Sequence, residues 1–300
     1  MSEPNSRPRN STTKTQRHKE LPTLADAARL VKEAGHSIPR ADAEYLMMHL
    51  LHAPRHGLYV GTGVATRIAG RFRRLVARAR AGEPVQYLVR SAPFLDFEVR
   101  VDHRVLIPRP ETEELVARVL AKLKSKAKSQ KPNAETRMVD YGTGSGCIAI
   151  ALARALPGTR VLAVDASKAA LAVAARNVAR YGLAKRVRMA QARAFDQPVL
   201  ARLRGRVDLL ISNPPYVPSP RLARLGGIVR REPRLALDGG PKGANIVAML
   251  LTHGPGLLTR GGLLAIEIDA THEAAVRRLA PDAEVERDLA GRIRYAFLTR

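Results

Sequence analysis

Apolar residues recur at helical spacing in the first part of the chain, over Leu24–Ala81. Positions three and four apart fall on one face of a helix, so this spacing predicts a small helical bundle. Two helices are sharply defined, at Arg40–Leu51 and Thr66–Arg80, and an earlier one begins after Thr23, which can cap it. We therefore predict an N-terminal helical domain over residues 22–82.

The apolar runs become short and interrupted after the helix-breaking Gly82-Glu83-Pro84. Runs at Val85–Leu88, Phe94–Val101 and Val105–Ile107 predict strands that are separated by turns. They indicate a β-hairpin over residues 83–107 that bridges to the next domain.

Strand and helix patterns alternate in the remainder of the chain. A helix is predicted from Glu111 to about Lys124, and a basic linker loop over residues 122–134. The predicted strands are Arg137–Tyr141, Arg160–Val164, Val187–Ala190, Val207–Ser212, Leu263–Ile268, Glu284–Leu289 and Tyr295–Thr299. The predicted helices between them are Cys147–Ala155, Lys168–Tyr181, Gly243–Leu257 and His272–Ala280. This alternation predicts an α/β domain over residues 108–300, with a mostly parallel sheet covered on both faces.

Composition narrows the class of protein. Residues 1–21 are polar and basic, which predicts a disordered tail; a transit peptide is the alternative, although Glu3 and the lack of an apolar face count against it. No apolar run is long enough to span a bilayer, so we expect a soluble, cytoplasmic protein without membrane partners. A single cysteine, Cys147, excludes an internal disulfide and a zinc cluster, and no spacing of His and Cys suggests a metal site.

The net charge is strongly positive, at +24 from 51 Lys and Arg against 27 Asp and Glu. Such an excess favours a polyanionic neighbour such as RNA, DNA or a ribosomal assembly. Arginine is spread through the whole chain, however, and a coding bias accounts for it equally well. No RNA-reading motif with interleaved aromatic residues is present, so nucleic-acid contact stays open.

A glycine-rich segment, Asp140-Tyr141-Gly142-Thr143-Gly144-Ser145-Gly146, joins a predicted strand to a predicted helix. Glycines let the backbone turn tightly and approach a ligand closely. The spacing differs from that of dinucleotide-binding enzymes and of P-loop proteins. About twenty residues on, Asp165 ends the next strand, where a carboxylate can accept hydrogen bonds from both hydroxyls of a ribose. Asp165 could instead cap the following helix.

A second segment, Asn213-Pro214-Pro215-Tyr216, follows the predicted strand Val207–Ser212. Two prolines fix a rigid, extended turn and leave acceptors exposed, namely the Asn213 side-chain oxygen and the Pro214 carbonyl. Such a pair can accept both hydrogens of a planar –NH2 group, and Tyr216 can stack on its flat face. This segment therefore predicts that an –NH2 group is presented to an electrophile.

Together these motifs carry a family resemblance that extends from about Leu24 to the C-terminus. The chain resembles the HemK/PrmC-type protein-(glutamine-N5) methyltransferases. The matching stretches are residues 82–88 (GEPVQYL), 106–113 (LIPRPETE), the GTGSG loop, NPPY, and 232–240 (EPRLALDGG). NPPY occurs also in adenine-N6 methyltransferases, whereas the second and last of these stretches are more specific to the glutamine branch.

The resemblance implies a class I S-adenosylmethionine-dependent methyltransferase with a Rossmann-like, seven-stranded, mostly parallel sheet. The residues that it places at the S-adenosylmethionine site are Gly142, Thr143, Gly144, Ser145, Gly146 and Asp165, to which we add Asp140, Phe195 and Asn213. It assigns the substrate glutamine to Asn213, Pro214, Pro215 and Tyr216.

One segment departs from the family pattern. The family usually carries an Asp-Trp-Phe-like segment near the adenine, where this chain has Ala192-Arg193-Ala194-Phe195-Asp196. Arg193 thus replaces the acid, and Ala194 replaces the tryptophan. Phe195 can still pack on the adenine, but either cofactor affinity is lower or Asp196 substitutes for the missing acid.

The leading hypothesis is methylation of the glutamine in the Gly-Gly-Gln tip of peptide chain release factors. Ribosomal protein L3 is the alternative protein substrate. An adenine-N6 nucleic-acid methyltransferase is a second hypothesis, favoured by the charge and opposed by the absence of a separate target-recognition domain. A non-catalytic RNA- or ribosome-binding relative, supported by Arg193, is a third. We expect the helical domain to recognise the protein substrate.

Overall fold

The computed structural model describes residues 25–127 and 136–300. The chain divides into two compact units, residues 1–76 and 77–300, so the division falls before the predicted domain end at residue 82. The predicted tail, the Thr23 cap and most of the predicted basic loop lie outside the described residues. The bounds that we predict for the domains stay predictions.

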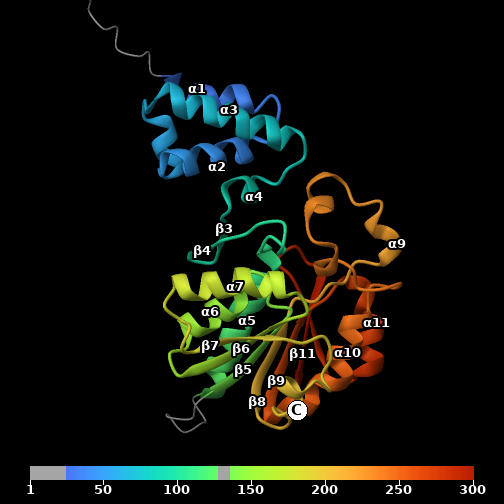
Figure 1. Ribbon diagram of the computed structural model, residues 1–300. Coiled ribbons are helices and arrows are strands. Elements are labelled where there is room, and N and C mark those ends of the chain that lie inside the picture. Colours follow the sequence, from blue (N-terminus) through green and yellow to red (C-terminus); the bar gives the residue numbers. More distant parts are fainter. Residues whose placement is uncertain (1–24, 128–135) are drawn as a thin grey trace, which may run out of the picture. The chain divides into compact units, whose positions relative to one another are not determined.

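The N-terminal unit is helical (Figure 1). It contains α1 (Ala27–Ala34), α2 (Arg40–Leu51), the 3-10 helix η1 (Arg55–Tyr59) and most of α3 (Thr66–Arg80). Both ends of α2 and α3 agree with the prediction. Two short strands, β1 (Ala25–Asp26) and β2 (Gly63–Val64), precede α1 and α3 and pair in antiparallel register. Large apolar side chains fill its centre: Leu46, Met47, Leu58 and Phe72 are almost fully buried.

Residues 83–107 contain a helix and a hairpin. The predicted strand Val85–Leu88 is wrong, because these residues belong to α4 (Val85–Val89). Pro84 precedes this helix with a φ of −57°, and the buried residues Val85 and Val89 lie four apart, on one helical face.

The run Phe94–Val101 forms two strands rather than one, β3 (Ala92–Phe94) and β4 (Phe97–Val99). They pair in antiparallel register around a turn in which Leu95 has a φ of 53°. The predicted strand Val105–Ile107 is not a strand. Val105 and Ile107 are buried because they enter the apolar core, and Leu106 between them lines the candidate site.

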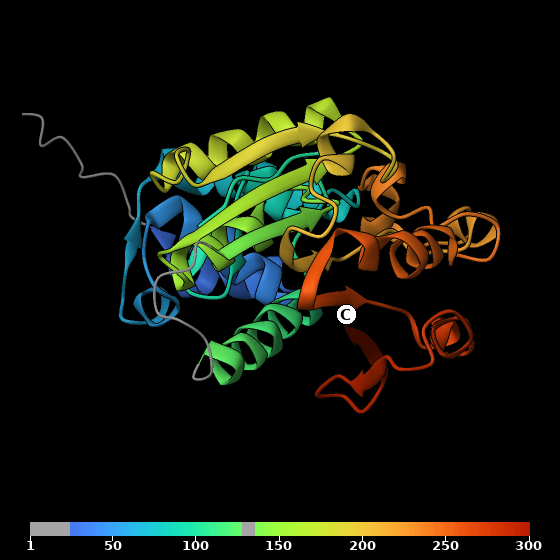
Figure 2. The same ribbon diagram turned by 90° about the horizontal axis from the view of Figure 1, so that it is seen from below.

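The C-terminal unit is built on a seven-stranded sheet in the order β10-β11-β9-β8-β5-β6-β7. Its strands are β5 (Thr136–Tyr141), β6 (Thr159–Asp165), β7 (Val187–Gln191), β8 (Val207–Ser212), β9 (Leu258–Glu267), β10 (Glu284–Arg287) and β11 (Ile293–Thr299). The five strands from β9 to β7 are parallel, and β11 is antiparallel to both of its neighbours. Figure 2 shows β10 and β11 in red at the edge of the sheet opposite β7.

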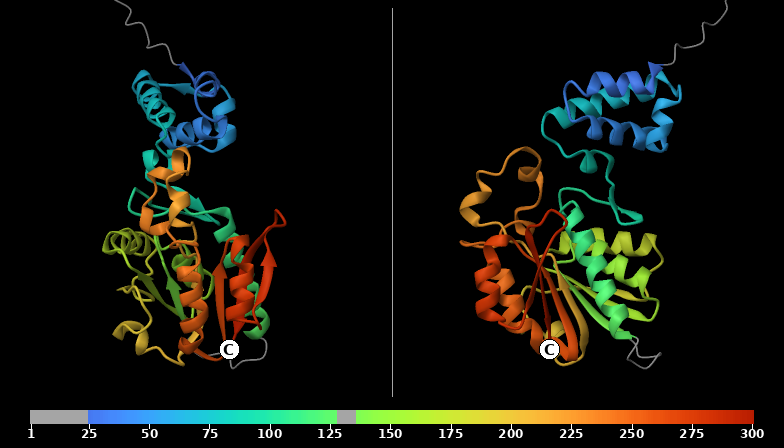
Figure 3. Two further views of the ribbon diagram at one scale, coloured as in Figure 1. Left: turned by 90° about the vertical axis from the view of Figure 1, so that its right-hand side faces the viewer. Right: turned by 180° about the vertical axis from the view of Figure 1, so that it is seen from behind.

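Helices cover both faces of this sheet (Figure 3). One face carries α5 (Pro110–Ala127), α6 (Cys147–Ala155) and α7 (Lys168–Arg180), and the other carries α10 (Asn245–His253) and α11 (Glu273–Leu279). Each face has its own apolar core, and alternate residues of each strand enter opposite cores. The predicted fold class is therefore confirmed.

All seven predicted strands of this unit form, and α6 has both of its predicted ends. The largest difference is at β9, which begins at Leu258 rather than at Leu263. The register shifts there, and a side chain at Gly262 would clash with the backbone, so the start of the strand lacks the alternation by which strands are recognised. The helix α5 continues to Ala127 through residues that were predicted to form the linker loop.

Shorter helices complete the unit. They are α8 (Pro198–Ala201), α9 (Ser219–Leu222), η2 (Gly227–Arg231), η3 (Arg234–Ala236), η4 (Gly254–Leu257) and η5 (Ala270–His272). In the described part of the chain, no helix is long and apolar enough to cross a membrane. Cys147 is buried.

Candidate active site

A cavity of about 210 Å³ lies at the carboxyl ends of the parallel strands. Gly142 follows β5, Asp165 ends β6 and Asn213 follows β8, and all three line it. The strand β5 has β6 on one side and β8 on the other, so the order of strands along the chain reverses here. Ligands of open α/β sheets bind at such a switch point.

The glycine loop is organised by contacts with its immediate neighbours. The backbone N–H groups of Gly142 and Thr143 both donate to the Val164 carbonyl, at 2.8 and 2.9 Å. Gly142 and Gly144 have φ values of 77° and 53°, a region that favours glycine. At Gly146 a Cβ would lie 3.2 Å from that of Ala174, so the third glycine serves the packing of α6 on α7.

Asp140 lies below this loop and not in the cavity. It is fully buried, and its Oδ2 accepts from the Thr143 hydroxyl at 2.6 Å and from the Ala149 N–H at 3.1 Å. Burial raises the pKa of this carboxyl to about 7. Asp140 therefore supports the loop through these two hydrogen bonds.

Asp165 faces the cavity from the end of β6. Its Oδ2 accepts from the Gly144 N–H at 2.9 Å, and its Oδ1 accepts from the Ser167 N–H at 2.8 Å. Burial raises the pKa of this carboxyl above its usual range. The cap of α7 is Ser167, whose hydroxyl accepts from the Ala170 N–H at 3.2 Å, so the alternative role of Asp165 as that cap is wrong.

Asn213 is tied to a helix that lies far away in sequence. Its side-chain nitrogen donates to the Thr112 hydroxyl of α5 at 2.8 Å. Thr112 in turn donates to Glu267 Oε2 at 2.7 Å, and the Tyr216 hydroxyl donates to Glu267 Oε1 at 3.1 Å. Glu267, at the end of β9, is fully buried, which raises the pKa of its carboxyl to about 7.

The backbone of the Asn-Pro-Pro-Tyr segment rests on a glycine-rich stretch. Val217 N–H donates to the Leu237 carbonyl at 2.8 Å, and Gly239 N–H donates to the Val217 carbonyl at 2.9 Å. A Cβ on Gly239 would lie 2.8 Å from the Pro215 carbonyl oxygen, and one on Gly243 would lie 2.4 Å from that of Tyr216. Only glycine allows this approach, which explains the second half of the EPRLALDGG stretch.

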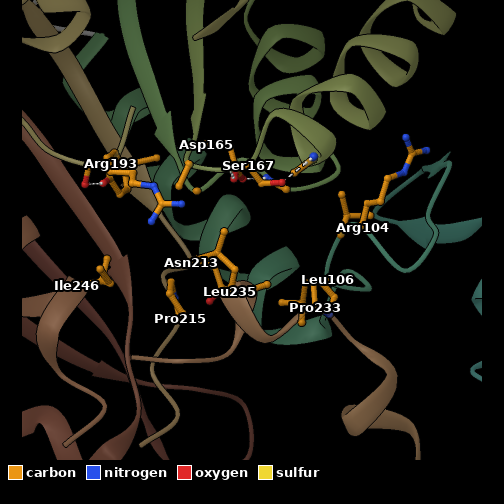
Figure 4. Close-up of a pocket in the computed structure, with 17 residues that line it drawn as sticks. Arg104, Leu106, Asp165, Ser167, Arg193, Asn213, Pro215, Pro233, Leu235 and Ile246 are labelled. Carbon is orange, nitrogen blue, oxygen red and sulfur yellow. Dashed lines mark hydrogen bonds between the residues drawn. The ribbon is translucent and has the colours of Figure 1, made fainter. Parts of the chain in front are cut away.

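The first half of that stretch builds a wall of the cavity. Pro233 and Leu235 line it together with Leu106, as Figure 4 shows. Glu232 is buried, accepts from the Ile107 N–H at 3.1 Å and pairs with Arg109. This carboxylate therefore joins two stretches that are more than a hundred residues apart, and it holds their apolar residues against the site.

The remaining wall carries the departure from the family pattern. Tyr141 stacks on Phe195 with ring centres 5.3 Å apart, and its hydroxyl donates to the Arg193 carbonyl at 2.7 Å. Tyr141 and Arg193 line the cavity, whereas Phe195 is buried and does not line it. Figure 4 shows Arg193 and Asp165 on the same side of the cavity. Tyr141 is therefore the aromatic residue among those that line the cavity.

The structure brings only part of the predicted site to the cavity surface. The predicted residues that line it are Gly142, Gly144, Asp165, Asn213 and Pro215. The predicted residues that do not line it are Asp140, Thr143, Ser145, Gly146, Phe195, Pro214 and Tyr216. Lining residues that the prediction lacked include Arg104, Leu106, Ser167, Leu235 and Ile246. Leu106 and Leu235 lie within two of the family stretches, whereas no motif of the sequence marks Arg104, Ser167 or Ile246.

Two sequence families match parts of the chain. The PrmC N-terminal domain matches residues 23–89, and the methyltransferase small domain matches residues 119–223. The release factor glutamine methyltransferase of Moorella thermoacetica is 42% identical over 260 residues, which cover 86% of this chain and 88% of that protein. That of Chlorobaculum tepidum is 41% identical over 245 residues, covering 80% and 82%.

Among solved structures, the hMettl16 catalytic domain in complex with the MAT2A 3'UTR hairpin 6 superposes with a TM-score of 0.51. It is 14% identical and covers 80% of this chain and 84% of that one. At this identity the likeness concerns the fold alone.

Proposed function

We propose, since this chain belongs to the family of release factor glutamine methyltransferases, that it methylates the side-chain amide nitrogen of a glutamine in a peptide chain release factor. The methyl donor is S-adenosylmethionine, and the target is the glutamine of the Gly-Gly-Gln tip. The observation that carries the proposal is the position of Asn213, which lines the same cavity as Asp165 and the glycine loop.

The residues of the cavity fit S-adenosylmethionine. Both carboxylate oxygens of Asp165 accept backbone hydrogen bonds that hold them in place, and each keeps a lone pair for a ribose hydroxyl. Gly142 and Gly144 line the cavity without side chains, which leaves room beside the backbone. Tyr141 is the aromatic residue among those that line the cavity, and we assign the adenine to it. When bound, the cofactor supplies an electrophilic methyl group on a sulfonium.

The chain's own contribution is to orient a poor nucleophile. The lone pair of an amide nitrogen is delocalised, so the nitrogen reacts only when it is held in line with the methyl group. We assign one amide hydrogen to the side-chain oxygen of Asn213, which lines the cavity, and we keep the Pro214 carbonyl of the same turn as the predicted acceptor of the other. Catalysis then rests on positioning and electrostatics, and the product sheds a proton after the transfer.

Methyl transfer from labelled S-adenosylmethionine tests the proposal. Release factor, ribosomal protein L3 and nucleic acid are offered separately to the full chain. We expect label in the release factor, and none in a release factor whose Gly-Gly-Gln glutamine is replaced by alanine. Label in nucleic acid alone would contradict the proposal.

The same experiment also tests the alternative substrates. Ribosomal protein L3 is retained as the alternative substrate, because an exposed glutamine would meet the same acceptors. Contact with nucleic acid is retained because of the net charge of +24. The helical domain stays our candidate for recognising the protein substrate, and the cytoplasm our predicted location.

A further inference from the structure

A chain of hydrogen bonds leads from the cavity to a fully buried carboxylate. It starts at Asn213 after β8, passes through Thr112 on α5 and ends at Glu267 on β9. The two heavy-atom distances are 2.8 and 2.7 Å. Thr112 and Glu267 are 3% and 0% exposed, so neither hydrogen bond competes with bulk water.

The chemistry of these groups fixes the direction of the chain. An ionised carboxylate only accepts hydrogen bonds, so the single hydrogen of the Thr112 hydroxyl is directed to Glu267. The Thr112 oxygen is then left as an acceptor, and it takes a hydrogen from the Asn213 amide nitrogen. The nitrogen end of this amide is thereby engaged, and its oxygen is the end that remains for the cavity. The ionised carboxylate therefore fixes the direction of both hydrogen bonds and, with it, the orientation of the Asn213 amide.

The same carboxylate also holds the far end of the Asn-Pro-Pro-Tyr segment. Its second oxygen accepts from the Tyr216 hydroxyl at 3.1 Å. One buried group thus contacts Tyr216 directly and Asn213 through Thr112. In the described part of the chain, the groups that donate to Glu267 are the hydroxyls of Thr112 and Tyr216. Arg294 on β11 also acts on this carboxyl, because its positive charge favours the ionised form.

We propose that Thr112 and Glu267 are positioning residues that hold the Asn213 amide with its oxygen towards the substrate. The inference rests on the proposed function and deepens it. With the amide reversed, Asn213 would present an –NH2 group to the –NH2 group of the substrate, and donor would face donor. The carboxylate prevents this reversal because it cannot supply a hydrogen to Thr112.

The test is Thr112→Val, which keeps the shape of the side chain and removes the hydroxyl. We expect kcat for release-factor methylation to fall by about 100-fold, as for other groups whose loss misaligns a reacting atom. The Kd for S-adenosylmethionine should change little, because Thr112 does not line the cavity. Thr112→Ser restores the hydroxyl and should recover most of the rate.

The matched control is Thr159→Val. Thr159 is 2% exposed and lies at the start of β6, at the opposite end of the sheet from the cavity. Thr159→Val makes the same chemical change at a similarly buried position, and we expect kcat to stay at the wild-type value. If both variants lose stability but only Thr112→Val loses rate at a temperature where both are folded, the loss belongs to the site.

The decisive measurement is a double variant. In the background of Asn213→Ala, the change Thr112→Val should cost nothing further in single-turnover rate, since there is no amide left to orient. A purely structural role of Thr112 predicts that the two losses multiply, and that result would overturn the proposal. Glu267→Gln should fall between wild type and Thr112→Val, because a glutamine can accept from Thr112 or donate to it.

Failure of the inference and failure of the proposed function give different results. A wild-type chain that binds S-adenosylmethionine but labels no release factor defeats the proposed function. A wild-type chain that labels release factor while Thr112→Val retains full kcat leaves the function standing and defeats the inference.

Discussion

The two halves of the cavity are held in place by different means. The glycine loop is fixed by its neighbours: Asp140 bonds to Thr143, three residues on, and Val164 accepts from the loop backbone. The Asn-Pro-Pro-Tyr segment is fixed from afar, since Thr112 lies 101 residues before Asn213. The cofactor half of this cavity is thus held by contacts between residues that are close in sequence, whereas the substrate half depends on the assembled domain.

Asn213→Ala gives the largest effect and tests the separation of the two halves. We expect kcat on release factor to fall by about 1000-fold, because an acceptor for the reacting amide is lost. The Kd for S-adenosylmethionine, measured by calorimetry, should stay within roughly threefold of the wild-type value, because one hydrogen bond contributes little to the free energy of cofactor binding. A wild-type rate with intact cofactor binding would show that Asn213 does not orient the amide.

Gly239→Ala is expected to damage the substrate half through the backbone. The added Cβ would lie 2.3 Å from the Gly243 carbonyl oxygen and 2.8 Å from that of Pro215. We expect kcat to fall by about 100-fold and the melting temperature by roughly 5 °C, since a backbone shift must relieve the clash. Gly158→Ala is the control, because a Cβ there meets nothing within 4 Å. Equal effects of the two changes would refute the support role of Gly239.

Asp165→Ala is the complementary change in the cofactor half. Hydrogen bonds to a charged acceptor are lost, so we expect the Kd for S-adenosylmethionine to rise by roughly 10- to 100-fold. At saturating cofactor, kcat should recover most of its value, unlike that of Asn213→Ala. The exposed Asp282 offers a control, Asp282→Ala, that should leave both quantities unchanged. An unaltered Kd in Asp165→Ala would exclude Asp165 from the ribose site.

The pH dependence of kcat reports on the buried carboxylate. Burial raises the pKa of Glu267 from 4.5 to about 7. Below that pH the carboxyl gains a proton, can donate to Thr112 and loses its hold on the direction of the hydrogen bonds. We therefore expect kcat to rise about tenfold between pH 6 and 8, with a midpoint near 7, given that each pH unit changes the ratio of the two forms tenfold.

The charged and titratable groups that face Glu267 are the other candidates for the source of this step, the rise in kcat with pH. They are Glu111 on α5, Tyr216 after β8, and Arg294 and Tyr295 on β11. Of these, only Glu111 is another carboxyl, and its charge raises the pKa of Glu267. In Glu267→Gln the step should vanish. A step of the same size and midpoint in this variant would place the titration elsewhere.

Arg193→Ala is expected to have the smallest effect. The guanidinium lines the cavity, where it opposes a cationic sulfonium more than the neutral product left after transfer. We expect the ratio of affinities for S-adenosylmethionine over S-adenosylhomocysteine to rise by about threefold at low salt, and less at high salt. An unchanged ratio would show that Arg193 is too well solvated to act on the cofactor.

The sequence predicted the elements that have a regular period or a local motif. Strand β8 and helix α6 were predicted with both of their ends, because each has an apolar pattern bounded by glycine or proline. The order of Gly142, Asp165 and Asn213 along the chain correctly placed all three at one edge of the sheet. Val85–Leu88 was mistaken for a strand because a single helical turn is too short to show its period.

The supports of the site could not be predicted in the same way. Glu267 is the last residue of the apolar strand β9, and nothing in its surroundings along the chain marks it as the partner of Thr112, 155 residues earlier. Phe195 was expected at the adenine, but it stacks on Tyr141 and does not line the cavity. Both cases depend on which side chains meet in three dimensions, and a single sequence does not contain that information.

The hydrogen bond from Thr112 to Glu267 has a consequence for the order of events during synthesis. The glycine loop and Asp165 have both been synthesised by the time β7 ends, at Gln191. Glu267 emerges much later, and long-range contacts of this kind form slowly even in a complete chain. The nascent enzyme should therefore gain a cofactor site before it gains a substrate site, and its catalytic power should be the last of its properties to appear.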